Sequence, residues 1–441
     1  MKVLVVGGGG REHALAAALH RSGAELFSAM KNNNPGIARL ATAVRLVPET
    51  EVAKVVAFAR ESGVELAVVG PEAPLEAGLV DALEREGIGC VGPTRAAARL
   101  ETSKSFAREV MQRHNVPGNL RFASFDDLEE AKRYVRESDV ELAIKPVGLT
   151  GGKGVKVQGE HLLTLQDAYR YLEEVFGQGI GGGAVILEER AVGEEFTLQV
   201  FCDGRDVAPM PLVQDHKRAY EGDVGPNTGG MGSYSAEDHL LPFVGDDDRQ
   251  AALDIVRRTV AAMAAEGHPY RGVLYGQFML TADGPRVIEF NARFGDPEAM
   301  NVLSILDSPM LDICQGIVDG RLPSTTVSFA PKATVCKYVV PAGYGTAPQA
   351  GKRIEVDEAA IAREGARAYY AMVNAEDGRI VTTTSRAVGV VGIDDSIAAA
   401  EQACERALQH VHGEAIYVRH DIGRAELVNK RVEHMARVRK G

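Results

Sequence analysis

Short apolar runs alternate with amphipathic segments over the first hundred residues of the chain. The runs at residues 2–6, 26–30 and 66–70 have the length and composition of buried strands. The segments between them have the wider apolar spacing of helices, and they comprise a helix ending at residue 20 and two more at 51–61 and 78–86. Alternating strands and helices predict an open parallel sheet that binds ligands at the carboxyl ends of its strands.

After residue 100 the pattern changes to paired strands. A helix is expected to begin near residues 102–104 and to end before Pro117. Further strands are predicted at 142–146, 155–157, 184–190, 272–280 and 287–293. The turn at 282–285 folds the last two strands into a hairpin.

Two other regions complete the pattern. Residues 214–233 contain five glycines together with Pro226 and Asn227, so we expect a long irregular loop, a type of segment that often carries function. A last region begins after residue 324, with predicted strands at 333–340 and 387–391 and a predicted helix at 396–412.

Composition places the chain among soluble globular proteins. Its 441 residues are enough for about three domains, and 45% hydrophobic with 25% charged residues is ordinary for this class. A net charge of −12 argues against broad binding of nucleic acid or anionic membranes, although local basic pockets for phosphate remain possible. No apolar stretch approaches the roughly twenty residues that cross a bilayer, and the first run ends at Val6 and is a strand. Five dispersed cysteines indicate reduced, mostly buried thiols in a cytoplasmic protein.

The predicted hairpin at 272–293 carries an unusual set of polar residues. Alternation places Glu289, Asn291 and Arg293 on one face, and Gln277 lies opposite them on the neighbouring strand. Carboxylate and amide oxygens suit a hard divalent cation that phosphate also holds, and the arginine can bind an anion beside it. A ribbon with one solvated face is the alternative. The number of polar groups in apolar strands favours a metal–nucleotide site with Gln277, Glu289 and Asn291 as ligands.

A second hairpin has a glycine-rich tip. Lys145 lies in the first strand and Lys153 lies in the tip, so the two lysines bracket unobstructed backbone amides that can close over polyphosphate. The tip is not a Walker loop, because Gly154 follows the lysine and no helix comes next. Glycines alone would indicate only a flexible surface hairpin, but the lysines and the metal hairpin downstream favour a phosphate lid.

Four glycines, residues 7–10, follow the first strand. A dinucleotide fingerprint would need a third small residue where His13 stands and a carboxylate after the second strand, where Lys31 and Asn32 stand. The NAD interpretation is therefore weak. A glycine turn entering a helix can still cradle phosphate, and a simple tight turn is the open alternative.

Several motifs together resemble one family. The segment 291–298 (NARFGDPE), GGREHA at 9–14, DHKR at 215–218 and GPNTGGMG at 225–232 occur in the order found in glycinamide ribonucleotide synthetases of the ATP-grasp superfamily. The resemblance extends from Gly7 to Gly423. It implies an α/β and α+β multidomain fold: an N-terminal open parallel α/β domain (1–102), an ATP-grasp core (103–120 and 190–324), a mobile lid (121–189) and a small C-terminal α+β domain (325–441).

The resemblance also implies roles for individual residues. ATP phosphates would be bound by Lys104, Lys145, Gly151, Gly152, Lys153 and Gly154. Near the base and ribose the resemblance places Glu188, Glu189, Ala191 and Glu195, although the acids, taken alone, indicate a solvated strand end. Phosphoribosylamine would be bound by Gly9, Gly10, Arg11, Glu12, Pro71 and Glu72. Groups acting on phosphate, carboxylate or ammonium would be Asp215, Lys217, Arg218, Arg293 and Asp296.

The activity that the resemblance implies is ATP-dependent ligation of glycine to 5-phosphoribosylamine through glycyl phosphate, in purine biosynthesis. ATP would be the co-substrate with Mg²⁺ or Mn²⁺, and neither nucleic acid nor membrane would be a partner. A monomer or weak dimer in the cytoplasm is expected. Another ATP-grasp carboxylate–amine ligase or a purine-pathway carboxylase is one alternative, and an NAD-linked or non-enzymatic binding protein is another.

Overall fold

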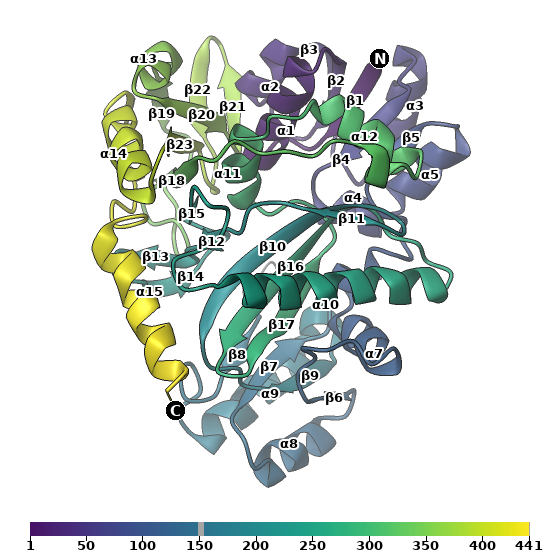
Figure 1. Cartoon of the computed structure of the whole chain (residues 1–441), viewed down its shortest axis with the longest axis vertical. Helices are drawn as coiled ribbons and strands as arrows, with labels where there is room; N and C mark the ends of the chain where they lie inside the picture. The colour runs from purple at the N-terminus through teal and green to yellow at the C-terminus, as the bar shows by residue number, and fades with distance from the viewer. Residues whose placement is uncertain (149–153, 441) are drawn as a thin grey trace.

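The computed structural model describes residues 1–148 and 154–440, and Figure 1 shows its parts arranged around a central sheet. The N-terminal part is a parallel sheet with strand order β3-β2-β1-β4-β5. Its strands are β1 (Lys2–Val6), β2 (Glu25–Met30), β3 (Ala41–Leu46), β4 (Leu66–Val69) and β5 (Gly89–Val91). The predicted parallel sheet is confirmed. Strands β3 and β5 were not predicted, because β3 is largely exposed and β5 is only three residues long.

Helices connect the strands of this sheet. They are α1 (Gly10–Arg21), α2 (Pro35–Leu40), α3 (Val52–Ser62), α4 (Glu72–Glu76), α5 (Leu79–Arg85) and α6 (Arg99–Thr102). Strands β1 and β4 bury side chains on both faces, as their continuous apolar runs require. The helices α1, α3 and α5 lie within one or two residues of their predicted bounds.

A small antiparallel sheet lies at the far end of the molecule (Figure 1). Its order is β6-β9-β7-β8, formed by β6 (Phe122–Phe125), β7 (Leu142–Pro146), β8 (Lys156–Val157) and β9 (Val185–Glu189). The helices α8 (Leu128–Glu137) and α9 (Leu165–Gln178) pack on it and share its separate apolar core. The predicted strands on either side of the glycine tip are confirmed, while residues 149–153 lie outside the described part of the chain.

The central sheet has the antiparallel order β11-β10-β16-β17. Its strands are β10 (Glu194–Asp203), β11 (Val207–Pro209), β16 (Arg271–Thr281) and β17 (Gly284–Asn291), and α7 (Lys104–Arg113) and α10 (Asp246–Ala265) pack beside it. The predicted hairpin is confirmed, with Gln277 opposite Glu289. A bulge after Gln277 interrupts the predicted alternation at Ile288, and Arg293 lies beyond the end of β17.

The C-terminal sheet draws strands from two distant parts of the sequence. Its order is β12-β15-β18-β23-β20, formed by β12 (Gln214–Asp215), β15 (Gly232–Ser235), β18 (Ala333–Pro341), β20 (Ala366–Tyr370) and β23 (Val388–Asp394). The irregular loop predicted for 214–233 was therefore wrong in part. Its ends are strands, and β13 (Arg218–Tyr220) pairs with β14 (Val224–Asn227) between them. The pairing of β15 with β18 also joins the expected core to the expected C-terminal domain.

Several helices and a smaller sheet complete the chain. The smaller sheet has the order β21-β22-β19-β24, formed by β21 (Val373–Glu376), β22 (Arg379–Thr382), β19 (Arg353–Val356) and β24 (Val411–Gly413). The remaining helices include α11 (Glu298–Ser304), α12 (Met310–Val318), α13 (Glu358–Arg363), α14 (Ile397–Leu408) and α15 (Ala425–Val438). The helix predicted at 396–412 ends early because β24 follows it. Helix α15 lies alone along one side of Figure 1 and reaches from the C-terminal sheet toward the small sheet.

Two expectations from composition can be compared with the structure. All five cysteines are buried and unpaired, as expected. Within the described part of the chain, no helix has both the length and the apolar character needed to cross a bilayer.

Candidate active site

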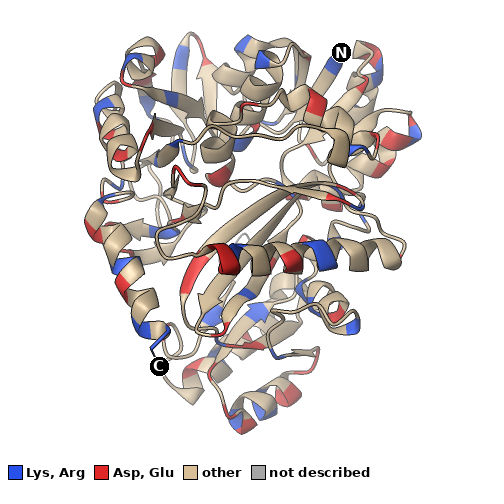
Figure 2. Ribbon diagram, viewed as in Figure 1, with Lys and Arg blue, Asp and Glu red and all other residues tan. Residues whose placement is uncertain are grey.

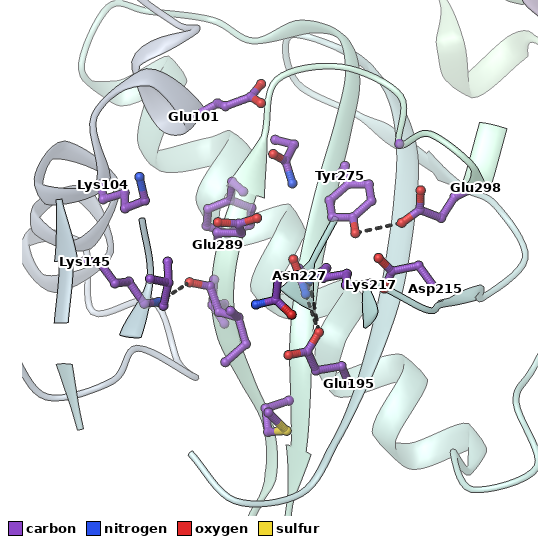
Figure 3. Close-up of a pocket in the computed structure, with 18 of the residues that line it drawn as sticks. Glu101, Lys104, Lys145, Glu195, Asp215, Lys217, Asn227, Tyr275, Glu289 and Glu298 are labelled. Atoms are coloured by element: carbon purple, nitrogen blue, oxygen red, sulfur yellow. Dashed lines mark hydrogen bonds and ion pairs between the residues drawn. The ribbon is translucent and has the colours of Figure 1, made fainter. Parts of the chain in front are cut away.

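A cavity of about 580 Å³ lies where the parts of the molecule meet. Its wall includes Glu72 and Glu101 from the N-terminal part, Lys145 from the small sheet and Arg431 from α15, as well as the β16–β17 hairpin. Figure 3 shows that acidic and basic side chains point into it from both sides. Over the rest of the chain, Figure 2 shows Lys and Arg mixed with Asp and Glu on every part of the ribbon. The basic residues that line the cavity include Lys104, Lys145, Lys217 and Arg293.

On the side of the small sheet, one carboxylate serves two cations. Glu188 accepts hydrogen bonds from Nε and Nη2 of Arg108, both 2.8 Å long, and its Oε2 lies 2.7 Å from Nζ of Lys145. The three side chains are 5% exposed or less. Burial would raise the pKa of Glu188, but the two cations lower it to about 2. This carboxylate is therefore fully engaged in holding Lys145, which sequence reasoning had placed near the phosphates.

The bulge in β17 completes this arrangement. Arg108 donates to the carbonyl oxygens of Val287 and Ile288, and Lys145 donates to that of Ile288 at 3.2 Å. An extra residue in one strand turns backbone carbonyls away from the ladder, which is why they can accept bonds from side chains. Through these contacts the bulge holds the β16–β17 hairpin against the small sheet. Sequence alternation could not reveal it, because Ile288 is an ordinary strand residue.

Glu195 connects the central sheet to the DHKR segment. Its Oε2 accepts a 2.5 Å hydrogen bond from Nε2 of Gln277 and lies 3.2 Å from Nζ of Lys217. Burial opposes ionisation of Glu195, but the charge of Lys217 lowers its pKa overall. Burial likewise opposes charge on Lys217, and Glu195 and Asp215 raise its pKa above the usual value. Both groups are therefore charged at neutral pH.

Arg293 lies between the hairpin and the N-terminal part. Its Nη2 is 3.0 Å from Oε1 of Glu101 and 3.2 Å from Oδ1 of Asn291, and its Nε is 3.3 Å from Oε2 of Glu72. Burial raises the pKa of Glu101 to about 7, although Arg293 opposes the rise. Burial would also raise the pKa of Glu72, but Arg293 and Arg11 bring it down to about 2. The guanidinium thus joins the hairpin to two acids of the N-terminal part.

Two carboxylates meet at the other end of the cavity. Figure 3 shows Asp215 next to Glu298, with Tyr275 donating a 2.9 Å hydrogen bond to Oε1 of Glu298. Among the described residues the Asp215 side chain has no hydrogen bond or ion pair. Burial raises the pKa of Asp215 to about 7; Lys217 opposes this rise, and Glu298 adds to it. An acidic pair of this kind is suited to receive a cation from solution.

The β16–β17 hairpin offers some of the oxygen ligands that a divalent cation would need. Glu289 lies in the cavity and forms no ion pair with the residues described here, so its carboxylate is available. Asn291 already accepts from Arg293, and Gln277 donates to Glu195, which leaves the amide oxygen of Gln277 for another partner. In the described chain, no three His, Cys, Asp or Glu side chains are grouped as a metal site. The residues fit a cation held by one carboxylate, amide oxygens and phosphate.

The N-terminal glycine turn is more occupied than expected. The amide of Gly9 donates to Oε2 of Glu12 at 2.7 Å, so this amide is already occupied and is not available to the predicted phosphate cradle. Arg11 donates to Glu12 and to the carbonyl of Phe294. A Cβ on Gly10 would lie 2.4 Å from the hydroxyl of Tyr338 in the C-terminal sheet. Gly10 is therefore a contact between two parts of the molecule.

Some of the other predicted residues contact the cavity or a neighbouring part of the molecule, and the rest lie elsewhere. Lys104 lines the cavity and donates to the carbonyl of Gly148 at 3.1 Å, while Asp296 accepts from Tyr338 and Arg386 of the C-terminal part. Arg218 pairs with Glu160 across to the small sheet. Away from these contacts, Glu189 pairs with Arg121, Pro71 precedes α4, Ala191 follows β9, and the carbonyl of Gly154 accepts from Tyr171. Gly151, Gly152 and Lys153 lie outside the described residues.

Sequence reasoning missed four side chains of the site. Tyr275 lies two residues before Gln277 on β16, so strand periodicity could have placed it on the same face. Glu298 stands at the end of the NARFGDPE motif and could have been taken with it. Arg108 and Glu101 gave no signal, because each is an isolated charged residue on a helix.

Comparisons with known proteins cover nearly the whole chain. Three sequence models of phosphoribosylglycinamide synthetase match it: the N domain at residues 1–101, the ATP-grasp (A) domain at 102–299 and the C domain at 334–425. A phosphoribosylamine--glycine ligase of Methanothermobacter thermautotrophicus is 55% identical over 100% of both chains. One of Pyrococcus horikoshii is 53% identical over 100% of this chain and 98% of its own.

Comparison with solved structures agrees with these sequence matches. The crystal structure of phosphoribosylamine--glycine ligase from Thermotoga maritima has a TM-score of 0.80 and 26% identity, covering 96% of this chain and 100% of that one. The biotin carboxylase domain of 2-oxoglutarate carboxylase from Hydrogenobacter thermophilus has a TM-score of 0.76 at 18% identity, which shows a shared fold. The motifs, the cavity that they line and the match of all three domains lead to one conclusion: this chain belongs to the phosphoribosylglycinamide synthetase family.

Proposed function

We propose that this protein joins glycine to 5-phosphoribosylamine at the expense of ATP, releasing ADP and phosphate, in the cytoplasm. The family and the names of its relatives support the reaction. The observation that carries the assignment to this cavity is its composition. It combines lysines that can meet phosphate, an available carboxylate in Glu289, and a separate acidic pair, Asp215 and Glu298, that can receive an ammonium group.

ATP would bind between the small sheet and the central sheet. Met111, Val157 and Met279 supply apolar surface to the cavity there, which suits an adenine ring. Glu195, held by Gln277 and Lys217, would accept from the ribose hydroxyls. Lys104 and Lys145 would contact the phosphates, and Glu188 would hold Lys145 in place and make no direct contact with the base.

A divalent cation, Mg²⁺ or Mn²⁺, would be held by Glu289 with the amide oxygens of Asn291 and Gln277. When bound, such an ion neutralises negative charge on the transferring phosphoryl group. Lys217 would add positive charge on the other side of that group. The charges of Glu195 and Asp215 keep its ammonium protonated. Positive charge would therefore surround the phosphate as the bond forms.

Glycine would bind with its ammonium group at Asp215 and Glu298. Ionising two adjacent carboxylates costs free energy unless a cation lies beside them. Among the described side chains, that of Asp215 has no hydrogen bond or ion pair, and that of Glu298 accepts a hydrogen bond from Tyr275. The hydroxyl of Tyr275 accepts from Thr197 and donates to Glu298, so it fixes one carboxylate in orientation. With the ammonium held there, the carboxylate of glycine would point toward Lys217 and the phosphates.

The reaction would need no nucleophile from the protein. A glycine carboxylate oxygen attacks the γ-phosphorus, the bond to the ADP oxygen breaks, and glycyl phosphate forms. The amine of phosphoribosylamine then attacks the acyl carbon, expels phosphate and loses a proton to give the amide. Arg293, joined to Glu72 and Glu101, lies on the N-terminal side and would steady the anionic acyl phosphate. The small sheet would exclude water, which otherwise hydrolyses the acyl phosphate.

The experiment that tests this function is a coupled assay of ADP release. We expect release that requires Mg²⁺, glycine and freshly prepared phosphoribosylamine together, with glycinamide ribonucleotide identified by mass. A carboxylase of the same fold would instead release ADP with bicarbonate. ADP release that ignores glycine would contradict the proposal.

A further inference from the structure

The last helix of the chain packs against the wall of the cavity. Helix α15 begins at Ala425, where the family's C-domain match ends, so almost all of it lies outside the matched regions. It packs on β10 and β16 of the central sheet, and Figure 1 shows it running beside that sheet. Its residue Arg431 is part of the cavity wall. The helix therefore contacts the site although the three family models leave nearly all of it uncovered.

Arg431 joins two acids from different segments. Its Nη1 lies 3.2 Å from Oε2 of Glu194, the first residue of β10, and its Nη2 pairs with Asp223, just before β14. Glu194 is 5% exposed and also accepts from Nδ1 of His434 at 2.5 Å. The guanidinium thus holds the start of a central strand and the 214–231 segment together.

Each of these acids stands close to a residue of the proposed site. Glu194 precedes Glu195, and strand alternation turns their side chains to opposite faces. Asp223 lies 3.2 Å from Nδ1 of His216, which is the neighbour of Lys217. Glu195 and Lys217 pair with each other inside the cavity. The acids held by Arg431 therefore adjoin the Glu195–Lys217 pair, and Arg431 contacts the same cavity.

We infer that Arg431 is a positioning residue for the ligase reaction: from α15 it holds Glu194 and Asp223 so that Glu195 and Lys217 keep a fixed separation. The inference rests on the proposed function. The 214–231 segment consists of very short strands and glycine-rich turns, so it depends on side-chain contacts for its place. Without Arg431, Glu194 would keep its contact with His434 and Asp223 its contacts with Arg419 and His216, but no cation would lie between these two like charges. Their repulsion would separate the two segments.

The test compares Arg431→Ala with Lys430→Ala, which removes the same charge from an exposed position of the same helix. For Arg431→Ala we expect kcat/KM for ATP to fall by about 10- to 100-fold, as is typical when the support of a ligand is removed. Hydrogen exchange over residues 215–224 should become faster. Lys430→Ala should match the wild type in both measurements. Arg431→Lys should restore part of the activity, because one ammonium can reach only one of the two acids.

Two results would overturn the inference. One is wild-type kinetic constants in folded Arg431→Ala; the other is a lower melting temperature with no change in the constants or in exchange at 215–224. If Arg431→Ala does not fold, Arg431→Gln is measured instead and judged in the same way. If the wild type itself shows no glycine-dependent ADP release, the proposed function fails. Mg-ATP titration and hydrogen exchange on the same variants then still decide whether Arg431 holds the site.

Discussion

Replacing Asp215 by Asn should weaken glycine binding and at the same time stabilise the fold. The carboxylate lies beside Glu298, and its pKa is raised from 3.8 to about 7, chiefly by burial. A rise of this size corresponds to about 4 kcal/mol for ionising the group in the folded protein relative to the unfolded chain. Because Asp215 keeps some contact with solvent, screening reduces this value, and we expect the neutral amide to stabilise by about 1–2 kcal/mol at pH 8.

The raised pKa of Asp215 determines how the stability of the fold changes with pH. Above about pH 7 Asp215 is ionised in the folded and the unfolded chain, so the full destabilisation is present. Below pH 7 the folded protein takes up a proton and the unfolded chain does not until about pH 4, so the destabilisation shrinks as the pH falls. The stability difference between Asp215→Asn and the wild type should therefore be largest at pH 8 and smaller at pH 5.

Glycine binding should also depend on the ionisation of Asp215. An ammonium held by Asp215 and Glu298 requires the ionised carboxylate, so the KM for glycine of the wild type should rise as the pH falls below 7. The Asn variant should need about 10- to 150-fold more glycine, since a charged hydrogen bond contributes roughly 1.5–3 kcal/mol. Its affinity for Mg-ATP should hardly change. Melting curves at pH 8 and pH 5, with glycine and ATP titrations, provide the assay. A less stable variant with unchanged glycine KM would refute the reasoning.

Three further substitutions test other parts of the site. Glu289→Gln should lower turnover by orders of magnitude at saturating Mg²⁺ while melting normally, whereas Gln277→Ala should cost less; near-normal turnover of the first would contradict the metal site. Glu188→Gln should destabilise by about 3–5 kcal/mol in denaturant unfolding, because it leaves buried cations unpaired, whereas a base-binding role predicts a raised KM for ATP at normal stability. Gly10→Val should lower the melting temperature through collision with Tyr338; unchanged melting with loss of phosphoribosylamine binding alone would instead favour a phosphate cradle at Gly10.

The sequence predicted the fold where periodicity was strong. The runs that became β1, β4 and the β16–β17 hairpin are strongly apolar, and their partners are close in sequence or follow from the strand–helix alternation. The same logic failed for the 214–233 segment. Its strands β12 and β15 are very short, and β15 is completed by β18, about a hundred residues later. No local pattern reveals such a pairing.

The site was predictable only as far as motifs marked it. Glu289, Asn291 and Lys217 stand in recognisable motifs, and the structure brings them into one cavity. The contacts that orient them come from isolated residues. Arg108 and Arg431 lie on helices far apart in the chain, and each is one charged residue among many until folding places it against a buried acid. Charge neutralisation inside a cavity is a property of the tertiary structure.

The origin of the oxygen in the released phosphate tests the central claim most directly. Glycine labelled with ¹⁸O in both carboxylate positions is incubated with Mg-ATP, phosphoribosylamine and the wild-type protein, and the phosphate is analysed by mass. If the glycine carboxylate attacks the γ-phosphorus, each phosphate released with product should carry one ¹⁸O atom, and the amide should keep the other. Unlabelled phosphate formed together with product would contradict an acyl phosphate made from glycine, and with it the proposed roles of Asp215, Lys217 and Glu289.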